Sequence, residues 1–237
     1  MSYTPQGPRY YYSWTPAQPV RPRISTSRTE LMNIAIAYVV LTGDLILLFS
    51  GGSVLAGRGG VGASVTVQVV LIAAAAALTG FVAHEMAHKI VAQRMGFWAE
   101  FRMSPIGLVL SIVTAFVGFL FAAPGATMVG GMSAVDRKEW GETSVAGPLS
   151  NFGFAAIFYV ASIAAFRPFP GAVGPLLFLA WINLLFAGFN MLPIGPLDGA
   201  KVLRWSTEVW VAVFAMVVVF GVVTFLATAA GTPFVLF

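Results

Sequence analysis

Long stretches without a single Asp, Glu, Lys or Arg are the feature that most limits how this chain can fold. Such stretches lie between Arg102 and Asp136, between Glu142 and Arg167, between Arg167 and Asp198, and after Glu208. A helix needs about 20 apolar residues to cross the hydrocarbon core of a bilayer. Only 9% of the residues are charged, against roughly 25% in soluble domains. The sequence therefore predicts an all-α polytopic membrane protein.

The apolar stretches divide into five predicted transmembrane helices, with a sixth apolar segment whose path is left open. The five spans cover about residues 31–50, 63–93, 143–166, 174–193 and 209–228. Residues 105–123 are also apolar, but glycine and proline interrupt them, and we expect a re-entrant segment or a pair of short passes. Residues 1–28 hold five prolines, four arginines and no acidic residue, which predicts a disordered cytosolic tail before a membrane-embedded domain at 29–237.

The distribution of basic residues predicts the orientation of the protein in the membrane. If the tail is cytosolic and the five spans alternate, all 13 Lys and Arg residues except Arg58 and Arg167 lie at the cytosolic face. Positive charge is enriched on the cytosolic side of membrane proteins. This topology requires residues 105–123 to enter and leave on one side.

Composition excludes several kinds of site. The chain has no cysteine, which rules out disulfides and thiol catalysis. Its formal net charge of +4 does not form a basic patch interleaved with aromatic residues outside the tail, and we expect no nucleic-acid partner.

The two histidines of the chain form the motif His84-Glu85-Met86-Ala87-His88 near the end of a long apolar span. Residues i and i+4 share one face of a helix, so the two imidazoles can bind one zinc ion. Glu85 lies off that face and can act as general base on a metal-bound water. Ionisable groups inside a membrane are costly, which favours a functional site over a purely structural polar cluster.

A catalytic zinc site keeps three protein ligands and one open position, and here the third ligand must be a carboxylate. Most acidic residues sit among other charges in loops or at span ends, namely Glu30, Glu100, Asp136, Glu139, Glu142 and Glu208. Asp44 lies inside the first span at the wrong depth, where we expect a structural hydrogen bond. Asp198 remains, after prolines and glycines that break the helix before it.

The two motifs together resemble the site-2 protease family of intramembrane zinc metalloproteases. His84, Glu85 and His88 match its HExxH motif, and Asn190, Pro193, Asp198 and Gly199 match its NxxPxxxxDG motif. Residues 146–151, Ala-Gly-Pro-Leu-Ser-Asn, resemble the Gly-Pro element that opens the family's intervening core helix. The likeness covers about residues 63–205 and implies a three-helix catalytic core with a short β element after the HExxH helix.

The resemblance implies a role for each matching residue. His84, His88 and Asp198 are expected to bind one Zn²⁺ per chain, with Glu85 as general base. Asn190 is expected to hydrogen-bond the substrate backbone or the developing oxyanion. The expected substrate-binding residues are Thr127, Met128, Val129 and Gly130, on a strand whose free edge pairs with an unwound substrate, and Pro193.

The expected activity is hydrolysis of peptide bonds near the cytosolic ends of transmembrane segments in membrane-tethered, regulatory proteins, that is, regulated intramembrane proteolysis. The expected partners are such a transmembrane substrate and the lipid bilayer of the cell membrane. Two alternatives remain open from the sequence. One is a non-catalytic membrane scaffold that binds transmembrane segments, and the other is a metal transporter in which His and Asp line an ion path. Retention of Glu85 and the gathering of polar groups at one face argue against these alternatives.

Overall fold

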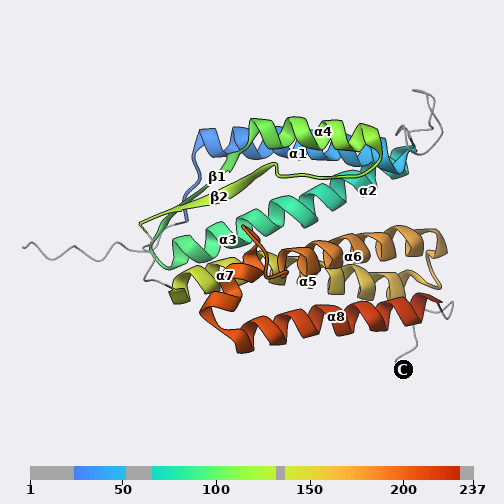
Figure 1. Ribbon diagram of the computed structural model, residues 1–237. Coiled ribbons are helices and arrows are strands. Elements are labelled where there is room, and N and C mark those ends of the chain that lie inside the picture. Colours follow the sequence, from blue (N-terminus) through green and yellow to red (C-terminus); the bar gives the residue numbers. More distant parts are fainter. Residues whose placement is uncertain (1–23, 52–65, 132–136, 230–237) are drawn as a thin grey trace, which may run out of the picture.

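The computed structural model describes residues 24–51, 66–131 and 137–229 (Figure 1). The predicted tail, residues 1–28, lies outside these ranges except for its last five residues. The described chain forms helices and one small sheet, with α1 at Arg28–Phe49, α2 at Val67–Ala77, η2 at Leu78–Val82, α3 at Ala83–Arg94, β1 at Trp98–Met103, α4 at Pro105–Val117, β2 at Gly125–Gly130, α5 at Arg137–Ala165, α6 at Pro170–Asn190, α7 at Asp198–Trp205 and α8 at Thr207–Ala229.

Five helices in the described residues are long and apolar enough to cross a membrane, which confirms the predicted class. They are α1, the continuous helix α2–η2–α3, α5, α6 and α8. Three of them begin several residues before the predicted spans, because caps rather than hydropathy set helix ends. In α1, the side chain of Ser27 accepts a hydrogen bond from the backbone N–H of Glu30 at 3.1 Å. In α6, Pro170 occupies the first turn, where its missing N–H costs nothing.

The segment between β1 and β2 enters and leaves at one place, as predicted. Ser104 caps the start of α4 by accepting a hydrogen bond from Gly107, and Gly118 ends the helix with a φ of +113°. The chain then returns alongside α4, and the backbone N–H of Ser104 donates to the carbonyl of Pro124 at 2.8 Å. The segment is thus a hairpin of one 13-residue helix and extended returning chain, the shape expected of a re-entrant segment rather than of two helical passes.

Strands β1 and β2 form an antiparallel pair beside α3 (Figure 1). The register places Phe101 opposite Thr127. Helix α1 lies along α4, and Ser111 of α4 donates a hydrogen bond to the buried carboxylate of Asp44 at 2.7 Å. Asp44 therefore joins two helices, which is the structural role expected for it.

Glu30 lies at the start of a span, as expected, in the first turn of α1, but its side chain is fully buried. Its carboxylate forms an ion pair with Lys89 of α3 and accepts the backbone N–H of Phe101 at 3.0 Å. Lys89 also donates to Thr26, and the amide of Gln93 donates to the carbonyl of Ala99. These bonds attach the start of α1 and the strand β1 to α3, one residue beyond His88.

The predicted three-helix core consists of α2–η2–α3, α5 and α6. Helix α5 packs against α3, α6 and α7, and α8 packs against α6 and α7 (Figure 1). Two buried asparagines join the three core helices. Asn151 of α5 and Asn183 of α6 hydrogen-bond to each other at 3.3 Å, and Asn183 also donates to the hydroxyl of Thr79 at 2.9 Å.

Candidate metal and active site

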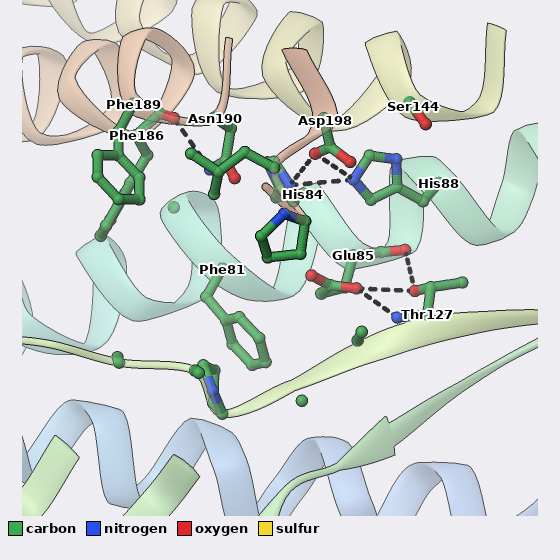
Figure 2. A pocket seen from close by; sticks show the side chains of 18 of the residues that line it. Phe81, His84, Glu85, His88, Thr127, Ser144, Phe186, Phe189, Asn190 and Asp198 are labelled. Carbon is green, nitrogen blue, oxygen red and sulfur yellow. Dashed lines mark hydrogen bonds and ion pairs between the residues drawn. The ribbon is translucent and has the colours of Figure 1, made fainter. Parts of the chain in front are cut away.

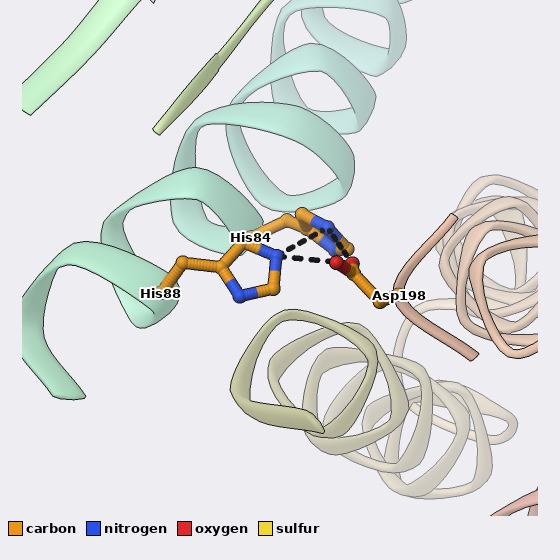
Figure 3. Close-up of side chains that lie close together, drawn as sticks. All are labelled: His84, His88 and Asp198. Atoms are coloured by element: carbon orange, nitrogen blue, oxygen red, sulfur yellow. Dashed lines mark hydrogen bonds and ion pairs between the residues drawn. The ribbon is translucent and has the colours of Figure 1, made fainter. Parts of the chain in front are cut away.

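The side chains of His84, His88 and Asp198 converge between α3 and the start of α7 (Figure 3). The two Nε2 atoms are 3.0 Å apart, and the Oδ2 atom of Asp198 lies 3.3 Å from His84 and 3.1 Å from His88. All three side chains are buried. Two residues one helical turn apart thus meet a carboxylate that is more than a hundred positions away in the sequence.

Hydrogen bonds to the far side of each imidazole fix which nitrogen faces the cluster. The Nδ1 atom of His88 lies 2.6 Å from the carbonyl oxygen of Thr143, and that of His84 lies 2.6 Å from the side-chain oxygen of Asn151. Both partners are acceptors, so each Nδ1 carries a hydrogen that it donates. Both Nε2 atoms are therefore left with lone pairs directed at the cluster, which is the arrangement usual for metal-binding histidines.

The orientation of the Asn151 amide follows from its other partners. Its nitrogen donates to the backbone carbonyls of Thr79 and Gly80 at 3.2 and 3.0 Å. Those carbonyls belong to η2, a π-helical turn that leaves backbone acceptors without their usual partners. With the amide nitrogen held there, only the amide oxygen can face His84. Asn151 thus links the irregular turn to the first residue of the HExxH motif.

The donor set fits a zinc ion. Two imidazole nitrogens and a carboxylate oxygen lie within 4.8 Å of one another, which is the kind and number of protein ligands found in catalytic zinc sites. Gly147 of α5 leaves the space for it. A Cβ atom at this position would lie 2.4 Å from Nε2 of His88 and 2.6 Å from Nε2 of His84. Any side chain at residue 147 would collide with the Nε2 atoms of both imidazoles.

Asp198 is held at the start of α7 by a sharply bent loop. A Cβ at Gly199 would lie 2.2 Å from the carbonyl oxygen of Met191, so only glycine permits this close approach. The second carboxylate oxygen of Asp198 lies 3.1 Å from the ammonium of Lys201. The carboxylate therefore has a positive charge beside it.

Glu85 lies on the β2 side of α3, next to the strand that the family resemblance implied (Figure 2). One carboxylate oxygen of Glu85 accepts the backbone N–H of Thr127 at 2.8 Å. The hydroxyl of Thr127 lies 2.9 Å from the same oxygen and 3.0 Å from the backbone carbonyl of Glu85. Glu85 and β2 are thus in direct contact.

A cavity of about 560 Å³ brings these groups together. Its walls include all three converging side chains, Glu85, Asn190 and an apolar surface formed by Phe81, Phe121, Phe186 and Phe189. Such a cavity, mostly apolar with a few polar groups, is typical of a binding site. Asn190 faces it with its amide nitrogen donating to the carbonyl of Phe186 at 3.0 Å (Figure 2).

The predicted substrate-binding residues divide into two groups. Thr127 and Val129 line the cavity. Met128 and Pro193 are exposed, and neither they nor Gly130 belong to its walls. Gly147 and Asn151 belong to the segment that resembles the Gly-Pro element, and the structure places both against the imidazoles. Their spacing of four residues was the available signal, because it puts both on one face of α5.

Comparison with known proteins supports the same chemistry. The model of Peptidase family M50 matches residues 168–228, which include Asn190 and Asp198. A protein of Methanocaldococcus jannaschii named “Putative zinc metalloprotease” is 38% identical over 156 residues, which cover 62% of this chain and 77% of the relative. “Putative zinc metalloprotease Rip3” of Mycobacterium tuberculosis is 30% identical over 129 residues, which cover 54% of this chain and 28% of that protein. No solved structure matches the chain significantly.

The archaeal relative is matched over 77% of its length, and the described part of this chain has five helices that are long and apolar enough to cross a membrane. Membership of this family also identifies the metal as zinc. The relatives are named as zinc metalloproteases, and the cluster of His84, His88 and Asp198 suits that ion. The chain therefore belongs to the site-2 protease family, Peptidase family M50, and is a multi-pass membrane zinc metalloprotease.

Proposed function

We propose that this protein is an intramembrane endopeptidase that cleaves transmembrane segments of membrane-tethered, regulatory proteins near their cytosolic ends. The observation that carries the proposal is the convergence of His84, His88 and Asp198 inside a helix bundle, with Glu85 lining the same cavity. The cavity walls are mainly apolar, which suits a segment that arrives from the hydrocarbon core rather than from water.

In this proposal the three converging side chains bind zinc, which supplies a Lewis acid that polarises the scissile carbonyl and acidifies the attacking water. Glu85 accepts a proton from that water and passes it to the leaving amine nitrogen. Asn190 donates its amide hydrogens to the substrate backbone or to the developing oxyanion. To do so, its amide gives up the hydrogen bond that it donates to the carbonyl of Phe186. The buried Nδ1 bonds of the two histidines keep their rings from turning during these steps.

A helical substrate must unwind before it is cut, because its carbonyls are shielded by helical hydrogen bonds. The edge of β2 that borders the cavity supports this step, since an added strand satisfies the backbone groups that unwinding exposes. Thr127 and Val129 face the cavity at that edge and are the residues proposed to pair with the substrate. The proposed substrates are single-span proteins with helix-breaking residues near their cytosolic ends.

The test is cleavage of a single-span peptide with a glycine pair near its cytosolic end, in detergent with zinc. Glu85→Gln keeps the shape of the side chain but removes the base, so cleavage should fall at least about 100-fold while the zinc content stays at the wild-type level. Glu142→Gln is the control, because Glu142 pairs with Lys138 on the exposed side of α5. Cleavage by Glu85→Gln at the wild-type rate, or by wild-type protein stripped of zinc, would refute the proposal.

A further inference from the structure

The two edges of the small sheet have different neighbours, and the hydrogen bonds show which backbone groups point outward. Phe101 and Thr127 are opposite each other in the ladder. The N–H of Phe101 donates away from the sheet to Glu30, and the N–H of Thr127 donates away from the sheet to Glu85. The two residues therefore form a non-hydrogen-bonded pair, and alternation places the outward N–H and C=O groups of β2 at Gly125, Thr127 and Val129.

The outer edge of β1 is already covered by side chains. The carboxylate of Glu30 accepts the N–H of Phe101 at 3.0 Å, and the amide of Gln93 donates to the carbonyl of Ala99 at 2.8 Å. Both side chains are buried, and the carboxylate is further held by Lys89. A strand cannot add to an edge whose groups are occupied in this way. In the described part of the sheet, the edge of β2 that borders the cavity is the one that remains for a substrate.

Glu85 uses the same backbone donor that an added strand needs. The N–H of Thr127 lies at the middle of the outward edge and donates to the Glu85 carboxylate at 2.8 Å. Figure 2 shows that carboxylate turned toward Thr127 rather than toward Asp198. An N–H has one hydrogen to donate, so Glu85 and a substrate carbonyl compete for it.

We propose that Thr127 couples substrate pairing to the release of the catalytic base. When an unwound segment pairs with β2, its carbonyl takes the N–H of Thr127, and the Glu85 carboxylate leaves that donor for the water beside the zinc ligands. The hydroxyl of Thr127, which also reaches the backbone carbonyl of Glu85, keeps β2 and α3 together during the exchange. Thr127 is in this sense a positioning residue for Glu85. The inference rests on the proposed function, because it requires a substrate strand at β2.

The competition can be measured without cleavage, using two zinc-loaded variants that lack the base. Glu85→Gln keeps an acceptor for Thr127, whereas Glu85→Met has a similar size and offers no strong acceptor. The probe is a fluorescent single-span peptide with a glycine pair near its cytosolic end. Glu85→Met should bind this peptide roughly tenfold more tightly than Glu85→Gln, since the N–H of Thr127 is free in it. A peptide with leucines in place of the glycine pair stays helical and should bind both variants equally.

Equal binding of the glycine peptide to both variants would overturn the inference. The inference would also fail if the leucine peptide preferred Glu85→Met as strongly as the glycine peptide does, because that preference would reflect apolar contact alone. These outcomes are independent of whether the wild-type protein cuts the peptide. Absence of zinc-dependent cleavage refutes the proposed function, whereas normal cleavage with no difference between the two variants refutes only the coupling.

A second measurement separates positioning from stability. Thr127→Val keeps the backbone N–H and the β-branched shape but removes the hydroxyl. Without the hydrogen bond to the backbone carbonyl of Glu85, β2 and α3 are no longer held together during the exchange, so kcat should fall roughly tenfold with KM unchanged. Thr127→Ser should restore kcat. Thr228→Val is the matched control, because the hydroxyl of Thr228 donates to the carbonyl of Thr224 within α8. A wild-type kcat in Thr127→Val, or a rise in KM alone, contradicts the positioning role.

Discussion

Gly147 shows at the scale of one residue how closely α5 approaches the paired imidazoles. The position has no side chain, and the Nε2 atoms of His84 and His88 lie where a Cβ would make contacts of 2.6 Å and 2.4 Å. Real Cβ atoms do not tolerate such distances, and interiors are packed too tightly for α5 to move away without cost. Neither ring can turn aside freely, because each donates its Nδ1 hydrogen to a buried acceptor.

Gly147→Ala should therefore abolish zinc binding, because the added methyl group would collide with the Nε2 atoms of both imidazoles and push them out of place. The measurement is the zinc content of the purified variant, together with its helical circular dichroism. Gly153→Ala on the same helix is the control, since a Cβ there meets no atom within 4 Å. We expect wild-type zinc content in Gly153→Ala. A Gly147→Ala protein that retains full zinc would show that the ion binds elsewhere.

At the scale of elements, the start of α1 is fastened to α3 and β1 by a buried ion pair. Glu30 and Lys89 have almost no exposed surface. Burying two charges is costly, so the pair itself contributes little to stability, but removing one partner leaves the other charge uncompensated. The same carboxylate covers the edge of β1, and β1 in turn sets the position of β2 beside Glu85. A residue in the first turn of α1 thus supports the strand that faces the cavity.

Glu30→Ala should lower the free energy of unfolding by about 3–5 kcal/mol, the usual cost of leaving a buried charge unpaired. Thermal denaturation in detergent measures the loss. Glu142→Ala breaks the exposed pair with Lys138, and should change stability by less than about 1 kcal/mol. If the two substitutions lowered the free energy of unfolding equally, the ion pair of Glu30 and Lys89 would not be what holds α1 against α3.

The whole molecule has two ends that differ in charge and in chemistry. The end of α3, the start of α5 and helix α7 lie together at one end, while the connection between α5 and α6 lies at the other (Figure 1). Arg94, Arg137, Lys201 and Arg204 belong to the first end. By the positive-inside rule this end, which holds the proposed active site, is predicted to be cytosolic.

Cysteine labelling tests that orientation without background, because the chain has no cysteine of its own. Single cysteines at Ser104 and Met128 should react with an impermeant maleimide applied from the cytosolic side. A cysteine at Gly171, where a Cβ meets nothing within 4 Å, should react from the opposite side. Labelling of Ser104 and Met128 from different sides would contradict the re-entrant path of α4, and labelling of all three from the reverse sides would invert the predicted orientation.

The sequence by itself determined the class of the protein and the core of its site. Charge-free stretches long enough to cross a bilayer predict membrane helices, since no water is available there to solvate a charge. The HExxH spacing alone places His84 and His88 on one helical face. Both are local properties, set by the bilayer thickness and by the helical repeat.

Only the tertiary structure decided which residues support those groups. Asn151 meets His84 across 67 positions of sequence, and Thr127 meets Glu85 across 42. Glu30 lies in the first turn of α1, where an acidic residue is common and usually exposed. Its partners Lys89 and Phe101 nevertheless bury its side chain completely. The sequence also left two paths open for residues 105–123, and the pairing of β1 with β2 selected one. Such contacts depend on how helices approach one another, and no local repeat in a single sequence encodes that approach.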